Sequence, residues 1–91
     1  MTHRYVVTGR VQGVGFRWFV EKEAREIGVS GWVRNNEDGS VEVLASGTPD
    51  QLERLRKSLK QGPRAARVDA VQEFEVEQEH SDRSFRIEGA W

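Results

Sequence analysis

The chain has 91 residues, of which 36% are hydrophobic and 32% charged, and its formal net charge at pH 7 is −1. This length and balance fit one small domain, residues 1–91, and exclude an intrinsically disordered chain. The near-neutral charge excludes a protein drawn as a whole to nucleic acid or anionic membranes, and the absence of cysteine excludes disulfides and thiolate chemistry.

The N-terminal residues MTHRYVV contain no long apolar run. They predict neither a signal peptide nor a membrane span, and we expect a cytoplasmic protein. YVVTGRV, residues 5–11, is rich in β-branched and aromatic residues and predicts a first strand. From Phe16 to Ile27 the apolar residues recur at helical spacing, which predicts an amphipathic helix, and Gly28 suits its C-terminal cap.

A hairpin should follow, because the strand-like runs 31–35 and 40–46 flank the turn-forming residues NNEDG. Thr48, Pro49 and Gln51 form a capping box with a first-position proline, so a second helix should start there and end at the Gly-Pro pair 62–63. RVDAVQEFEVE, residues 67–77, predicts a fourth strand, and SFRIEGA, residues 84–90, a short fifth. The polar residues EQEHSD between them indicate a loop.

This β-α-β-β-α-β order predicts the α+β class and a ferredoxin-like sandwich. We expect a mainly antiparallel sheet of four to five strands with two helices on one face. Each helix should join strands that are parallel and not adjacent. The fold alone does not give a function, because many unrelated functions share it.

GRVQGVGFR, Gly9 to Arg17, lies between the first strand and the first helix. Its glycines allow successive backbone N–H groups to converge, and such a concavity binds anions. The helix N-terminus adds unpaired amides, and Arg17 adds a planar fork of donors suited to phosphate. The Gly-Lys-Ser/Thr ending of a nucleotide P-loop and the glycine spacing of a dinucleotide site are absent. The loop therefore predicts a phosphate site of another kind, or a plain strand-to-helix turn.

Together with GWVRNNEDGSVEVLASG, Gly31 to Gly47, this loop resembles the acylphosphatase family. The loop matches Gly-x-Val-Gln-Gly-Val-x-Phe-Arg, and the second stretch matches Gly-aromatic-Val-Arg-Asn followed by Gly-x-Val and Gly at the family's spacing. The resemblance implies hydrolysis of acyl phosphates to a carboxylate and inorganic phosphate without metal or organic cofactor. It implies that Arg17 binds phosphate and Asn35 positions the attacking water. The phosphate-binding loop would be Gln12, Gly13, Val14, Gly15 and Phe16.

The scarcity of acids and bases fits this reaction, because a carboxylate leaves without protonation and phosphoryl transfer mainly needs positioning and charge. We expect a monomer that acts on a small molecule and binds neither nucleic acid nor membranes. The alternative is a non-catalytic ferredoxin-like module that binds an anion or RNA. We also expect Trp32 in the core, Trp18 exposed near the loop, and His3 and His80 at the surface.

Overall fold

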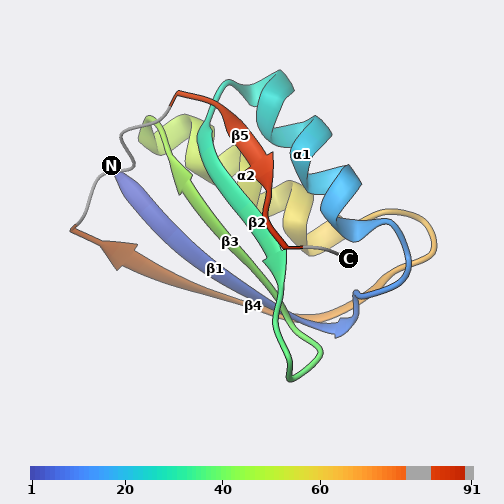
Figure 1. The fold of residues 1–91 in the computed structure, drawn as a ribbon. Helices are drawn as coiled ribbons and strands as arrows, with labels where there is room; N and C mark the ends of the chain where they lie inside the picture. Colours follow the sequence, from blue (N-terminus) through green and yellow to red (C-terminus); the bar gives the residue numbers. More distant parts are fainter. Residues whose placement is uncertain (78–82, 90–91) are drawn as a thin grey trace.

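The computed structural model describes residues 1–77 and 83–89 of the chain (Figure 1). His80 and most of the predicted loop between the last two strands lie outside the described residues. These parts of the chain form five strands and two helices. They are β1 (Thr2–Arg10), α1 (Phe16–Ile27), β2 (Ser30–Asn35), β3 (Val41–Ser46), α2 (Pro49–Gln61), β4 (Arg67–Val76) and β5 (Phe85–Ile87).

The strands form one sheet in the order β4-β1-β3-β2-β5. β1 pairs antiparallel with both β3 and β4, and β2 pairs antiparallel with β3. β1 and β2 are therefore parallel and separated by β3, so α1 joins two parallel, non-adjacent strands as predicted. The sheet is mixed, because the short β5 runs parallel to β2 at the edge. The ferredoxin-like fold is confirmed, and its antiparallel description holds for every other strand pair.

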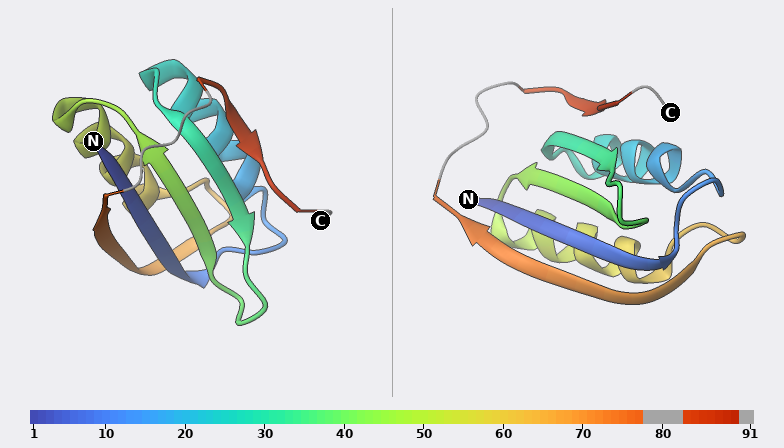
Figure 2. Two further views of the ribbon diagram at one scale, coloured as in Figure 1. Left: turned by 60° about the vertical axis from the view of Figure 1, so that its left-hand side comes forward. Right: turned by 60° about the horizontal axis from the view of Figure 1, so that its bottom comes forward.

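Both helices cover the same face of the sheet (Figures 1 and 2). The helices bury the apolar residues that their spacing predicts, and these pack against inward-facing strand residues in one core. α1 contributes Phe16, Val20, Ala24 and Ile27, and α2 contributes Leu52, Leu55 and Leu59. The buried face of α1 thus fixes the rotation of this helix about its axis. That rotation decides the direction of the side chains in its first turn. No helix among residues 1–77 and 83–89 is long and apolar enough to cross a membrane.

The helix ends follow the capping signals in the sequence. Gly28 ends α1 in the left-handed conformation, and its N–H donates to the Ala24 carbonyl. At the start of α2, the Gln51 N–H donates to Thr48 Oγ1, while the Thr48 N–H donates to Gln51 Oε1. α2 is therefore capped by its own side chains, whereas the N-terminus of α1 is not.

The other face of the sheet carries Trp32, which we expected in the core. β2 alternates, so Gly31 and Val33 face the helices and Trp32 faces away from them. The Arg34 guanidinium covers the Trp32 ring at 4.7 Å and also binds Glu42, with 3.0 Å between Nη2 and Oε1. The neighbouring Gly31 allows the close approach of β2 to β3, because a Cβ atom there would clash with the Leu44 carbonyl oxygen.

His3 is also less exposed than we expected. Its side chain is 17% exposed, and its Nδ1 lies 2.7 Å from Glu73 Oε2 on β4. Glu73 also contacts Arg56 of α2 at 3.5 Å. The adjacent Tyr5 hydroxyl donates to the Leu52 carbonyl, and burial, followed by the nearby Glu73 carboxylate, raises the pKa of the Tyr5 phenol. This polar cluster ties β1, β4 and α2 together at the end of the molecule where β1 begins.

Candidate active site

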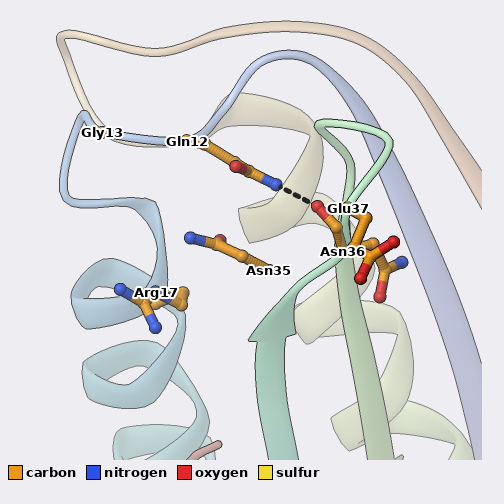
Figure 3. A pocket seen from close by; sticks show the side chains of 6 residues that line it. All are labelled: Gln12, Gly13, Arg17, Asn35, Asn36 and Glu37. Carbon is orange, nitrogen blue, oxygen red and sulfur yellow. Dashed lines mark hydrogen bonds between the residues drawn. The ribbon is translucent and has the colours of Figure 1, made fainter. Parts of the chain in front are cut away.

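The loop after β1, the first turn of α1 and the end of β2 meet around one open hollow (Figure 3). Its volume is about 520 Å³. The lining residues are Gln12, Gly13, Arg17, Asn35, Asn36 and Glu37. The two residues that the family resemblance singles out, Arg17 and Asn35, therefore reach the same space from different elements.

The loop backbone has the conformation that its glycines predict. Gly13 and Gly15 have φ angles of 74° and 77°, in the left-handed region. A Cβ atom at either position would meet nothing within 4 Å, so backbone conformation and not lack of space requires glycine there. Gly15 is the N-cap of α1, no side chain caps this helix, and no acid stands in its first turn. The first-turn amides are thus left without a side-chain acceptor, as in helix N-termini that bind anions.

We predict that Gly15→Ala lowers the free energy of unfolding by about 1–2 kcal/mol, because the Cβ atom of alanine lies too close to the backbone in the left-handed region. Gly15→Asn should lose less, since asparagine tolerates this conformation. Urea denaturation of the two variants and the wild type measures the difference. Equal losses in the two variants would show that the loss comes from adding any side chain and not from the backbone angle.

Arg17 stands in the first turn of α1, directly after the buried Phe16 that anchors this turn in the core. Within the described residues its guanidinium makes no hydrogen bond or ion pair. A cation at a helix N-terminus is unfavourable unless an anion neutralises it. The unpaired guanidinium and the uncapped amides of the same turn therefore form a region of positive potential with no internal counter-charge.

Asn35 is the last residue of β2, and its side chain lies on the helix-covered side of the sheet. Figure 3 shows it directed into the hollow, with the amide nitrogen toward α1. Its Oδ1 is buried and has no hydrogen-bond partner among the described residues. The amide nitrogen also makes no hydrogen bond within the described residues, and because it is directed into the hollow it is available to a bound molecule.

Gln12 has a role that sequence reasoning missed. Its Nε2 donates to the carbonyl oxygens of Asn36, at 2.8 Å, and Ser40, at 2.9 Å. The loop is thereby fastened to the turn that follows Asn35. The turn itself is closed by Asp38, whose Oδ1 accepts from the Ser40 hydroxyl at 2.6 Å and from the Ser40 N–H. These hydrogen bonds lower the pKa of the Asp38 carboxyl. The hydrogen bonds of Gln12 join residues that are far apart in the sequence, so no local sequence pattern could have predicted them.

The structure brings most of the expected site together, but not every side chain. Gln12, Gly13, Arg17 and Asn35 line the hollow. The Phe16 side chain lies in the core and the partly buried Val14 side chain packs against it, so neither lines this hollow. Glu37, which is absent from the expected set, also lines the hollow. The described residues contain no cluster of three or more His, Cys, Asp or Glu side chains that could hold a metal ion.

Fold and hollow together define a ferredoxin-like α+β protein with a site suited to a small anion. The acylphosphatase family model matches residues 3–87. An acylphosphatase of Koribacter versatilis is 60% identical over 90 residues, which cover 99% of this chain and 82% of that protein. One from Pasteurella multocida is 53% identical over 79 residues, covering 87% and 83%. The crystal structure of acylphosphatase from Bacillus subtilis superposes with a TM-score of 0.93 at 38% identity, covering 97% and 98%.

The chain therefore belongs to the acylphosphatase family. The activity of this family is hydrolysis of the carboxyl–phosphate bond in acyl phosphates, and the chain is a hydrolase of that kind. The resemblance carried by the two sequence motifs is confirmed.

Proposed function

We propose that the hollow is the catalytic site, that Arg17 and the backbone amides of residues 12–16 bind the phosphoryl group, and that Asn35 positions the attacking water. The observation that supports this most is the unpaired Arg17 guanidinium beside an uncapped helix N-terminus, in one hollow with Asn35. Guanidinium and amide donors of this kind match phosphoryl oxygens in shape and charge.

The reaction explains why so few groups suffice. Water attacks phosphorus, a P–O bond forms, and the bond between phosphorus and the acyl oxygen breaks. The electron pair leaves on a carboxylate, whose conjugate acid has a pKa of about 4, so no general acid is needed. Phosphoryl transfer through a loose transition state demands positioning and stabilisation of the equatorial oxygens. Arg17 and the loop amides supply that stabilisation from a rigid first turn.

Asn35 cannot act as a strong base, because its amide does not accept a proton at neutral pH. The orientation in Figure 3 turns the Asn35 amide nitrogen to the hollow, so we assign it as a donor to the water oxygen. One lone pair of the water oxygen then accepts this hydrogen bond, and the other lone pair is free to attack phosphorus. The water proton passes to a phosphoryl oxygen, which leaves inorganic phosphate as the product.

This mechanism uses no metal ion and no organic cofactor. We predict that incubation with excess EDTA followed by gel filtration leaves the rate of acetyl phosphate hydrolysis unchanged within about twofold, because every proposed role belongs to a protein group. Release of inorganic phosphate measures the rate. Loss of activity on chelation, restored by adding a divalent cation, would show that a metal ion takes one of these roles.

The direct test of the proposed function is hydrolysis of acetyl and benzoyl phosphate by the purified chain. We further propose that the chain is cytoplasmic and that it acts as a monomer; the second proposal is supported by the single copy that supplies all the residues that line the hollow. Sedimentation equilibrium at assay concentrations would detect a dimer.

The open face of the sheet bears on the RNA-binding alternative. On this face, strands β1 and β3 present Arg4, Val6, Glu42 and Leu44, with no aromatic residue. This surface does not favour the RNA-binding alternative, which needs exposed aromatics on two central strands.

A further inference from the structure

A second, smaller hollow of about 190 Å³ adjoins the first. The two share Gly13, Arg17 and Asn35 in their walls, so they open from the same phosphate-binding position. The residues that line only the smaller hollow are Val11, Gly15, Phe16 and Trp18. A substrate whose phosphoryl group lies against Arg17 can therefore extend in either of two directions.

Trp18 is the one bulky ring in this wall that faces water. Its side chain is 71% exposed, whereas Phe16, the other ring in the wall, is buried. The described residues contain one other exposed ring of this kind, Phe74, on the far face of the sheet under the Arg4 guanidinium at 4.6 Å. Trp18 has no such cover within the described residues. Single exposed apolar residues need no explanation by themselves; Trp18 differs because it borders the site.

Charge distinguishes the two directions. The larger hollow is lined by Gln12, Asn36 and the acidic residue Glu37, none of which lines the smaller hollow. The negative charge of Glu37 makes this direction unfavourable for a departing carboxylate. In the smaller hollow the exposed apolar side chain is Trp18, because Val11 and Phe16 are both buried. An apolar acyl group gains from covering the indole ring, and an aromatic group gains further from stacking on it.

We propose that Trp18 determines substrate specificity by packing against the acyl half of the substrate. The preferred substrates are then acyl phosphates whose acyl group is aromatic or extended and apolar. This inference rests on the proposed function of the hollow. It adds the direction of the acyl group and the class of substrate to that function.

The test compares benzoyl phosphate with acetyl phosphate in the wild type, Trp18→Ala, Trp18→Phe and Phe74→Ala. The measured quantity is the ratio of kcat/KM for benzoyl phosphate to kcat/KM for acetyl phosphate. Intrinsic differences between the two leaving groups cancel when variant ratios are divided by the wild-type ratio. We expect Trp18→Ala to lower the ratio about tenfold, the size of a lost apolar contact in a specificity pocket. Trp18→Phe should recover most of it, and Phe74→Ala, the matched exposed ring, should leave it unchanged.

Inhibition by inorganic phosphate, which has no acyl half, reports on the phosphate-binding loop alone. If Trp18→Ala weakens this inhibition as much as it lowers kcat/KM for benzoyl phosphate, Trp18 shapes the loop and the inference is wrong. A ratio within twofold of the wild type in Trp18→Ala also overturns it and points to another use of the exposed ring. A wild-type chain that hydrolyses neither substrate would instead refute the proposed function.

Discussion

Replacing Arg17 with alanine is expected to lower kcat/KM for acetyl phosphate by about 10³-fold or more. A single donor to a developing negative charge is worth about 10²–10³ in rate, and an arginine that stabilises a phosphoryl transition state about 10³–10⁵. Because the guanidinium would bind phosphoryl oxygens in the ground state as well, competitive inhibition by inorganic phosphate should weaken in parallel. Phosphate-release kinetics with and without added phosphate measure both effects.

The same variant should fold normally. Arg17 has no internal partner to lose. Removing a cation from a helix N-terminus relieves an unfavourable interaction of about 0.3–1 kcal/mol. The free energy of unfolding should therefore stay the same or rise slightly, which urea denaturation can measure. A matched control is Arg10→Ala, because Arg10 is an exposed arginine at the end of β1 that does not line the hollow.

Two outcomes would contradict the role given to Arg17. Substantial turnover by Arg17→Ala would show that the loop amides suffice, or that the phosphoryl group binds elsewhere. Full activity in Arg17→Lys would show that a point charge is enough, whereas the proposed role depends on the planar fork of donors.

The sequence predicted the fold well because its signals are local. The apolar spacing from Phe16 to Ile27, the capping box at Thr48 and the turn residues after Asn35 each act within a few positions, and each appears where predicted. The placement of Arg17 beside Asn35 follows from the fold, since α1 starts at the edge of the sheet where β2 ends. Once the element order was known, the two residues had little freedom to lie apart.

What the sequence could not show depends on contacts between distant segments. The hydrogen bonds of Gln12 join positions 24 and 28 residues apart, and nothing near Gln12 indicates their partners. Trp32 was wrongly expected in the core, because hydrophobicity does not say which face of β2 a residue occupies. The Arg34 guanidinium covers the ring, which leaves Trp32 half-buried although it lies outside the core. Only the register of β2 against β3 decides the matter.

Replacing Asn35 with alanine should lower the rate without the loss of phosphate binding that is expected of the Arg17 variant. We expect kcat for acetyl phosphate to fall about 10²–10³-fold, since loss of a well-placed polar contact to the reacting group costs that much. The inhibition constant for inorganic phosphate should change little, because the proposed partner of Asn35 is the water and not the phosphoryl oxygens. The Asn35 side chain makes no hydrogen bond within the described residues, so its truncation removes none from this part of the fold.

Two further variants separate this role from its neighbours. Asn35→Asp keeps the shape of the side chain but places a carboxylate beside the bound phosphate. It should therefore weaken inhibition by phosphate and also lower kcat. Asn36→Ala removes the adjacent amide, whose Nδ2 donates to Ser40 Oγ at 3.0 Å within the turn. Its effect on kcat should be much smaller.

One outcome would contradict the role given to Asn35. If Asn35→Ala binds inorganic phosphate far more weakly than the wild type, the Asn35 amide belongs to the phosphate-binding group. The attacking water would then need another protein group to hold it, and the larger hollow offers Gln12 and Glu37 for that position.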